Sequence, residues 1–395
     1  MPASDRVKKG MAESSWIRRM FEEGIDLKQK YGADRVFDLS LGNPIVEPPP
    51  EFKSELRRLA ENPTPGMHRY MENAGYPETR ASVANQLADE TGIRYTGGDI
   101  VMTCGAAAAL NIAIKTVVNN GDEVIIFAPY FAEYFHYISN HYGVPRVVPT
   151  DDRFLPKLDA LDAAIGPKTR AIIINSPNNP SGVVYQDDFL ASLGSLLQKR
   201  SSQLGQAVYL LSDEPYKRLI YDGVKFAYPS RHYANTIIVN SHSKDLALPG
   251  ERIGFIAIHP DCRDRVELLD GFVYCNRTLG FVNAPAFMQH AVRRLQAVSV
   301  SITDYQRKRD FLYDNLTRMG YSMLKPQGAF YMFPKTPIPD DVAFIRELQQ
   351  ELVLTVPGQG FGTPGYFRIS YCIDDRTIEG SLDGFRKVAR RYGLC

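Results

Sequence analysis

The middle of the chain alternates short apolar, β-branched runs with longer stretches of helical periodicity. The runs lie at residues 122–127, 170–175, 208–213, 236–240 and 252–258. Several of them lack polar alternation, which is typical of strands buried on both faces of a mostly parallel sheet. The intervening helical stretches lie at residues 106–118, 131–141 and 187–200. This alternation predicts an α/β fold.

The pattern changes from about residue 285. A long helical stretch is predicted up to residue 319, followed by short strands near 328–333 and 367–371, with a helix between them and another at the end. Near the N-terminus, residues 13–31 have the apolar spacing of an amphipathic helix. We therefore expect a smaller α/β domain that the N-terminal helix completes.

A proline-rich connector separates that N-terminal helix from the alternating region. Pro48, Pro49 and Pro50 form a stiff segment that suits a link between two domains. A chain of 395 residues is long enough for two domains. The predicted division is a large domain over 48–285 and a small domain made of 1–47 and 286–395.

Composition excludes several classes of function. The net charge of +1 gives no electrostatic case for nucleic acid or anionic membrane partners. The five cysteines are odd in number and form no Cys-x-x-Cys pair, and the seven histidines show no metal-ligand spacing, so no metal site is predicted. With no apolar signal core at the start and no run long enough to span a bilayer, a cytoplasmic protein is expected.

Polar residues of distinct types follow three of the predicted strands. Asn175 and Asp213 end two of the apolar runs, and the segment Ser241-His-Ser-Lys244 follows a third. Ligands of open α/β sheets bind beyond the carboxyl ends of the strands. These residues are therefore expected at one ligand site.

Lys244 and Arg252 together suggest the chemistry of that site. A lysine at the mouth of a strand, with an arginine placed to hold a phosphate, is what a pyridoxal phosphate enzyme needs. The lysine amine would condense with the cofactor aldehyde as a Schiff base. The alternative, a surface lysine in a loop, would have to explain the neighbouring segments separately.

The segment 103–108 joins a short predicted strand to a helix and is rich in small residues. Backbone N–H groups at Gly105, Ala106 and Ala107 could approach an anion at the helix N-terminus, and Arg252 would add a charge-assisted contact. A tight turn before an alanine-rich buried helix is the alternative for this segment taken alone.

Four further side chains suit a pyridine ring. A buried Asp213 would keep the ring nitrogen protonated, Tyr216 and Asn179 could hydrogen-bond the ring phenolate, and Phe131 offers an aromatic face. The alternatives are a strand-end cap for Asp213, core packing for Tyr216 and Phe131, and an ordinary loop around Asn179.

With these residues assembled, the chain resembles the class I/II pyridoxal phosphate aminotransferases, the aspartate aminotransferase-like group, over nearly its whole length. The motifs that carry the resemblance are Ser40-Leu-Gly42-Asn-Pro44, Tyr70-x4-Gly75-x4-Arg80, Gly105-Ala-Ala-Ala-Ala-Leu110, Asn175-x-Pro-x-Asn179-Pro-x-Gly182, Asp213-Glu-x-Tyr216, Ser241-x-Ser-Lys244, Gly250-x-Arg252-x-Gly254, Gly328-Ala-Phe-Tyr331 and Phe367-Arg368-Ile-Ser370.

The resemblance implies a fold and roles for residues. The fold would have a large, mostly parallel seven-stranded sheet domain sandwiched by helices, and a smaller α/β domain. Lys244 would carry the cofactor, and Ser241 would join Arg252 and the 105–107 amides at its phosphate. Arg368 would clamp the substrate α-carboxylate beside Gly42 and Asn179. Tyr70 would reach the phosphate of the neighbouring subunit, which implies a homodimer with shared active sites.

The implied reaction moves the α-amino group of an L-amino acid to a 2-oxo acid such as 2-oxoglutarate. Aspartate is the first expectation for the donor, with a broad neutral or aromatic range as the second. Some relatives that take acidic substrates carry a lysine near the position of Ala107, which this chain lacks. Cys104 is also an unusual residue for the phosphate turn, and Arg277 fits a solvated surface arginine better than a reader of a side-chain carboxylate.

Other reactions remain open. The same cofactor and fold support β-lyases, decarboxylases and racemases, because the bond broken depends on how the substrate lies over the ring. A ligand-sensing transcription regulator of this fold would need an added basic DNA-binding module, which the start of this chain does not provide.

Overall fold

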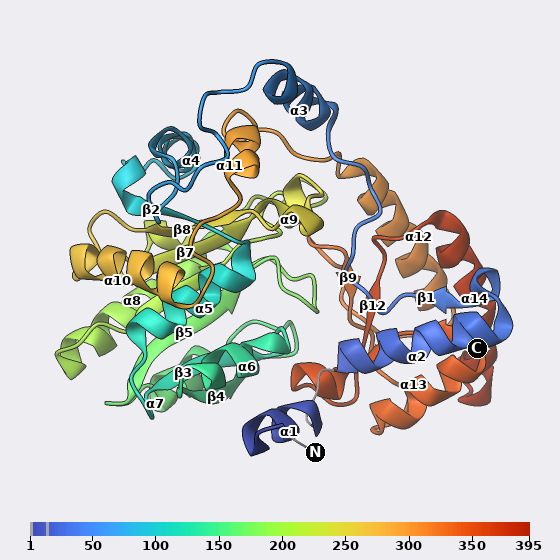
Figure 1. Ribbon diagram of the computed structural model, residues 1–395. Helices are drawn as coiled ribbons and strands as arrows, with labels where there is room; N and C mark the ends of the chain where they lie inside the picture. The colour runs from blue at the N-terminus through green and yellow to red at the C-terminus, as the bar shows by residue number, and fades with distance from the viewer. Residues whose placement is uncertain (1–2, 13–15) are drawn as a thin grey trace.

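The computed structural model describes residues 3–12 and 16–395. A seven-stranded sheet lies at its centre, in the order β2-β8-β7-β6-β5-β3-β4 (Figure 1). β8 is antiparallel to both of its neighbours, and the other neighbouring pairs are parallel, so the predicted mostly parallel α/β sheet is confirmed. The strands are β2 (Ile100–Thr103), β3 (Glu123–Ala128), β4 (Val144–Pro149), β5 (Thr169–Asn175), β6 (Tyr209–Asp213), β7 (Thr236–Ser241) and β8 (Gly254–Ile258).

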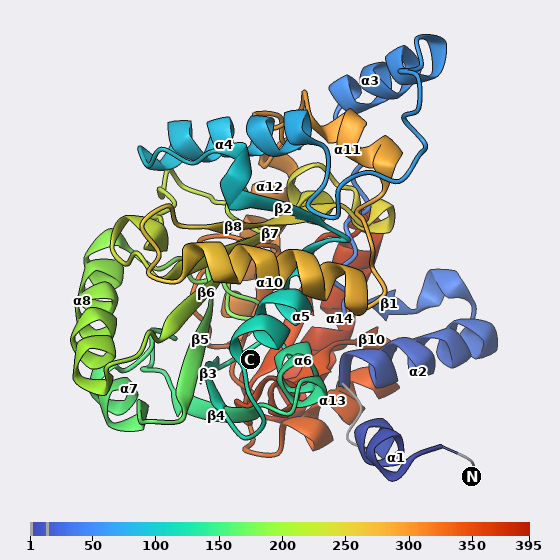
Figure 2. The same cartoon turned by 60° about the vertical axis from the view of Figure 1, so that its left-hand side comes forward.

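The central strands are apolar along their length because both faces of the sheet are covered. In β5, Ile172 and Ile174 pack into one hydrophobic cluster, while Ile173, which points the other way, packs into another. One face is covered by α5 (Ala106–Val117), α6 (Glu133–Asn140) and α10 (Arg265–Thr278), and α5 and α10 lie in front of the sheet in Figure 2. The other face is covered by α3 (Pro50–Glu61), α4 (Pro77–Thr91), α7 (Leu158–Ala164), α8 (Asp187–Leu204) and α11 (Ala286–Val292).

A second group of elements lies beside this sheet, to the right in Figure 1. It contains a three-stranded antiparallel sheet in the order β11-β12-β9 and a parallel pair, β1 with β10. Phe344, Phe367 and Phe385 are fully buried at its centre. Its elements are α2 (Trp16–Tyr31), β1 (Phe37–Asp38), α12 (Thr303–Arg318), β9 (Tyr331–Met332), α13 (Asp341–Gln350), β10 (Val353–Leu354), β11 (Val356–Pro357), β12 (Phe367–Ser370) and α14 (Asp375–Arg391).

The prediction of one helical stretch over 285–319 was wrong in its middle. The chain forms α11 and α12, and residues 293–302 between them are not helical. Val298, Val300 and Ile302 alternate with serines there, and β-branched residues and serine are weak helix formers. The backbone of this connector bonds elsewhere, since the Val300 N–H donates to the Asp245 carbonyl at 2.7 Å.

The predicted N-terminal helix over 13–31 is present as α2, which ends at Tyr31 as expected. α2 begins at Trp16, and residues 13–15, the expected start, lie outside the described residues. A further helix, α1 (Asp5–Ala12), precedes it. No helix within the described ranges is long and apolar enough to cross a membrane.

The division into a large domain over 48–285 and a small domain over 1–47 and 286–395 stays a prediction. α11, just past the predicted boundary, packs on α3 and α4 against the large sheet. The chain then crosses through residues 293–302 to α12 in the second group.

Candidate active site

A pocket of about 290 Å³ lies at the carboxyl ends of the parallel strands, between the sheet and the second group of elements. Asn175, Asp213 and Ser241 are the last residues of the neighbouring strands β5, β6 and β7, and all three line it. Parallel strands bring their carboxyl ends to one edge, so residues far apart in the sequence meet there. Of the predicted site residues, the loops beyond these three strands also contribute Asn179, Tyr216, Lys244 and Arg252 to the lining, and other segments contribute Gly42, Ala106, Ala107, Phe131 and Arg368.

Lys244 lies on α9 (His242–Asp245), a helix of one turn that directly follows β7. Its Nζ donates to the Gly42 carbonyl at 3.0 Å and lies 5.5 Å from the centre of the Phe330 ring. Burial lowers the pKa of Lys244 to about 8, and the positive charges of Arg252 and Arg368 act in the same direction. A substantial share of this amine is therefore neutral near pH 8, the form that attacks carbonyls.

Asp213 is buried at the end of β6. Its Oδ2 accepts a hydrogen bond from the Tyr134 hydroxyl at 2.5 Å, and its Oδ1 has no hydrogen-bond partner among the described residues. Burial raises the pKa of Asp213 to about 7, against the lowering effect of the Tyr134 bond. A buried carboxylate oxygen without a partner at a pocket wall fits a protonated ring nitrogen, which would supply the missing donor.

Sequence reasoning did not assign a role to Tyr134. The residue belongs to α6 and packs edge-on against Phe131, with 5.6 Å between the ring centres. The spacing of three residues from Phe131 within a predicted helix is the signal that would have placed both rings on one side. Tyr137, another three residues along, also lines the pocket.

The start of α5 and the Arg252 side chain form the end of the pocket suited to phosphate. Gly105 is the N-cap of α5 with φ of 83°, and a Cβ there would lie 2.9 Å from Arg252 Nη2, so glycine is required. Arg252 itself has φ of 51°, and its guanidinium donates to the carbonyls of Pro249 at 2.9 Å and Cys104 at 3.3 Å. The free N–H groups of the first turn and the guanidinium form a site for an anion. Gly105 itself lies beside the pocket and is not among its lining residues.

Two asparagines shape the wall beside Asp213. Asn175 Nδ2 donates to the Asp213 carbonyl at 2.9 Å, and Asn175 Oδ1 accepts from the Asn179 backbone N–H at 2.7 Å. Asn179 Oδ1 in turn accepts from Arg368 Nη1 at 3.1 Å. This chain of bonds links the ends of β5 and β6 to Arg368 on β12.

Arg368 is fully buried, and its guanidinium lies close to two aromatic rings. Its Cζ is 4.6 Å from the Tyr331 ring centre and 4.9 Å from that of Phe361, and Nη2 donates to the Ser40 carbonyl at 2.6 Å. Burial lowers the pKa of Arg368, and its Nε has no hydrogen-bond partner among the described residues. A buried guanidinium that packs on aromatic rings and has no anionic partner among the described residues is suited to a carboxylate.

Tyr331 connects this arginine to Tyr216. The two hydroxyl oxygens are 3.0 Å apart, and a Cβ at Gly42 would lie 1.9 Å from the Tyr331 hydroxyl. Gly42 is therefore required by the close approach of Tyr331. The sequence analysis quoted Tyr331 only as part of a motif and gave it no role.

Tyr70 is not at the pocket of its own chain. Its side chain is 89% exposed, and no lining residue comes from its segment. The expected role of Tyr70 at a neighbouring subunit stays a prediction. Within the described ranges, no group of three His, Cys, Asp or Glu side chains could hold a metal ion.

Comparisons with known proteins give one consistent result. The family described as "Aminotransferase class I and II" matches residues 34–385. A probable aspartate/prephenate aminotransferase from Thermus aquaticus is 32% identical over 392 residues, covering 98% of both chains. An aromatic-amino-acid aminotransferase 2 from Thermococcus litoralis is also 32% identical and covers all of both chains.

Solved structures agree with this result. An amino transferase from Eubacterium rectale is 37% identical with a TM-score of 0.96, and all of both chains is covered. The aspartate aminotransferase from Thermus thermophilus with maleate is 28% identical with a TM-score of 0.87, covering 98% of this chain and all of the other.

Proposed function

The chain belongs to the class I and II aminotransferases, and we propose that it moves the α-amino group of an L-amino acid to a 2-oxo acid with pyridoxal 5′-phosphate held on Lys244. The observation that carries the proposal is the set of three charged groups around one pocket. Lys244, Asp213 and Arg368 come from α9, β6 and β12, and each has the burial that its role requires.

The donor set fits the cofactor along the pocket. Arg252, Ser241 and the amides at the start of α5 would hold the phosphate, Phe131 would face the ring, and Asp213 Oδ1 would accept from the ring nitrogen. Tyr216 and Asn179 would lie at the ring phenolate. When bound, pyridoxal phosphate supplies an electron sink for charge released at the substrate α-carbon.

The protein's own residues would then bind the substrate and move a proton. Arg368 would hold the α-carboxylate through two parallel bonds, which fixes the α-carbon relative to Lys244. The Lys244 Nζ would take the proton from the substrate α-carbon and deliver it to the cofactor aldehyde carbon. Its lowered pKa lets it act as both base and acid near neutral pH. Asp213, as a carboxylate, would hold the ring nitrogen in its protonated form.

We propose aspartate as the first donor to test, since several relatives are named as aspartate aminotransferases. Among the described lining residues, the cations are Lys244, Arg252 and Arg368, and each already has a role above. A second carboxylate would therefore need a cation from outside this lining, and neutral or aromatic donors are the second expectation.

A donor panel with 2-oxoglutarate as acceptor tests the proposal. Transamination predicts a 2-oxo acid derived from the donor in equal amount to the glutamate formed. Pyruvate and ammonia in place of that pair would instead indicate a β-lyase. A panel in which no donor yields its 2-oxo acid would contradict the proposed reaction.

We also propose that the protein forms a homodimer with shared active sites. We further propose that it is located in the cytoplasm. The exposure of Tyr70 supports the dimer, because a large aromatic side chain that is 89% exposed is suited to a partner surface. Sedimentation of the purified protein tests the dimer, and a monomer that is fully active would contradict it.

A further inference from the structure

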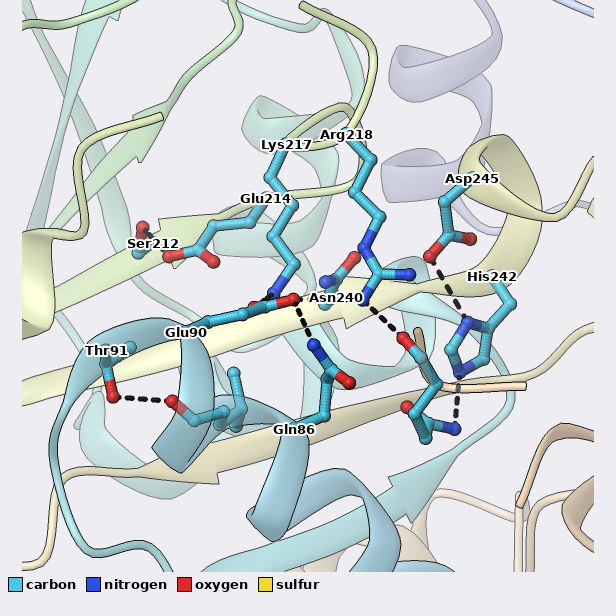
Figure 3. Close-up of polar contacts among 12 residues, drawn as sticks. Gln86, Glu90, Thr91, Ser212, Glu214, Lys217, Arg218, Asn240, His242 and Asp245 are labelled. Carbon is cyan, nitrogen blue, oxygen red and sulfur yellow. Dashed lines mark hydrogen bonds and ion pairs between the residues drawn. The ribbon is translucent and has the colours of Figure 1, made fainter. Parts of the chain in front are cut away.

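The helix that carries Lys244 cannot be stable by itself. α9 has four residues, and a single isolated turn is unfavourable in water. His242 and Asp245 are three positions apart on it, and their side chains are 3% and 6% exposed. His242 Nδ1 and Asp245 Oδ2 lie 3.4 Å apart, while Lys244 faces the pocket (Figure 3 shows the pair). The side chains of the turn thus divide between the pocket and the interior.

Gln296 contacts the other nitrogen of the His242 ring and favours one tautomer of a neutral imidazole. Its Nε2 donates to the Val292 carbonyl at 2.9 Å and lies 3.5 Å from His242 Nε2. A carbonyl only accepts, so this end of Gln296 is the NH2 group, and its other proton is available to His242 Nε2. A neutral imidazole would then carry its proton on Nδ1, the nitrogen that lies 3.4 Å from Asp245 Oδ2, within ion-pair distance but without hydrogen-bond geometry.

Gln296 is fixed in turn by a partly buried ionic cluster. Arg218 donates from Nη2 to the Gln296 carbonyl and from Nη1 to the Val298 carbonyl, the latter at 2.9 Å. Glu90, on α4, accepts from Arg218 at 2.9 Å and from Lys217 at 2.6 Å (Figure 3). Burial opposes the charge on Glu90, but Lys217 and Arg218 outweigh it and lower the pKa of Glu90 to about 2. This carboxylate is therefore charged under all ordinary conditions.

The network joins the loop after Tyr216, the 293–302 connector and the α9 turn, and the reaction needs these segments in fixed relative positions. Lys217 and Arg218 directly follow Tyr216, and the 293–302 connector supplies Gln296, Val298 and the Val300 N–H that bonds the Asp245 carbonyl. Stability alone is a weak reason to keep such a network, since well-packed apolar residues often replace a buried ion pair without loss. A requirement for position gives a better reason.

We propose that His242 and Asp245 are positioning residues for Lys244, which fix the α9 turn so that the Lys244 amine meets the cofactor aldehyde. Neither side chain lines the pocket, so both act through the backbone of the turn. Gln296 holds the His242 ring, and the Glu90 cluster holds Gln296. The inference rests on the proposed function of Lys244.

The test begins with cofactor-free protein. Pyridoxal 5′-phosphate is added, the adduct is trapped with borohydride, and its rate of formation on Lys244 is followed by peptide mass spectrometry. For Asp245→Ala we expect a trapping rate lower by about tenfold or more, since displacements near 1 Å cost on that order. The kcat should fall in parallel, with KM within about twofold because substrate binding is untouched. Asp245→Asn keeps an acceptor oxygen for His242 and should restore most of both rates.

A second variant and a control separate position from stability. Gln296→Met removes the donor to His242 at similar volume and should slow trapping in the same direction, so it decides the matter if Asp245→Ala does not fold. Asp99→Asn is the control, because Asp99 is a buried carboxylate, bonded to Arg265 at 2.5 Å, that precedes β2 at the end of the sheet away from the pocket. It should lower Tm and leave trapping unchanged.

The outcomes distinguish two failures. Folded Asp245→Ala and Gln296→Met proteins that trap the cofactor at the wild-type rate would overturn the positioning role alone. Wild-type protein that traps no cofactor on Lys244 would overturn the proposed function itself.

Discussion

The Tyr134 hydroxyl donates to one oxygen of Asp213 at 2.5 Å, and the other Asp213 oxygen has no partner among the described residues. The carboxylate is thus held in one orientation, with its free oxygen at the pocket wall. Because burial raises the pKa of Asp213 to about 7, the charged form is disfavoured in the cofactor-free protein. A bound cation would relieve this penalty.

The first prediction is that Asp213→Asn stabilises the cofactor-free protein at alkaline pH. The pKa of Asp213 in the folded protein lies above its value in the unfolded chain. The contribution of Asp213 to the free energy of unfolding is therefore fully present below about pH 4 and is lost as the pH rises through about 7. The variant should gain up to ~4 kcal/mol over wild type above pH 7, since the shift is about three units. Urea unfolding from pH 5 to 8 measures this difference, and a gap that does not widen with pH would contradict it.

The second prediction concerns the donor to that carboxylate. Tyr134→Phe removes a hydrogen bond that favours the charged form, so the pKa of Asp213 should rise by about one unit or more. At pH values below about 8, the variant should then bind the cofactor more weakly than wild type. A larger share of its Asp213 is protonated there and pairs poorly with a ring cation. The pH dependence of the cofactor Kd checks this, with Tyr233→Phe as the control, since Tyr233 is a buried tyrosine outside the pocket lining whose hydroxyl donates to the Val208 carbonyl.

The strand ends of the site could be predicted from the sequence, while the contacts among them could not. Asn175, Asp213 and Ser241 end apolar runs, and strands of a parallel sheet align their carboxyl ends, so their meeting follows from the pattern. The bond between Tyr134 and Asp213 joins residues 79 positions apart. It depends on how α6 packs over the sheet, which no local pattern specifies.

Helix α10 was missed for a physical reason. Gly271 lies in its middle and weakens the helical pattern, yet a Cβ there would lie 2.5 Å from the Thr116 side chain on α5. Close packing of α10 on α5 requires the glycine that lowers local helix propensity. Tertiary contact thus overrides the local signal in α10.

The third prediction is that Lys244→Ala abolishes multiple-turnover transamination. The long-wavelength absorbance of the lysine-bound cofactor should also disappear, because the proposed attachment is this one amine. Lys308→Ala is the control, since Lys308 is also buried but pairs with Asp304 on α12. A Lys244→Ala protein that retains both absorbance and turnover would refute the assignment.

The fourth prediction is that Arg368→Lys fails to replace the arginine. A lysine cannot present two parallel donors or stack on the Tyr331 and Phe361 rings as a planar guanidinium can. We expect kcat/KM for amino acids to fall about 30-fold or more, since loss of a buried charged contact costs about 2 kcal/mol and upward. Steady-state kinetics measure the fall, while reaction with an amine that lacks a carboxylate should change little. Equal losses for both substrates would argue against a carboxylate clamp.

The last prediction tests whether Tyr70 acts across a dimer. If it reaches the partner's phosphate, Tyr70→Ala should weaken cofactor binding about tenfold, the worth of one charge-assisted hydrogen bond. In a mixed dimer of Tyr70→Ala with Lys244→Ala, one of the two sites would combine both changes and the other would have neither. Mixing the two weak proteins should therefore restore up to half of the wild-type activity per hybrid dimer. If Tyr70 served only its own chain, every site in the hybrid would carry one change and no activity would return, which would rule out the shared site.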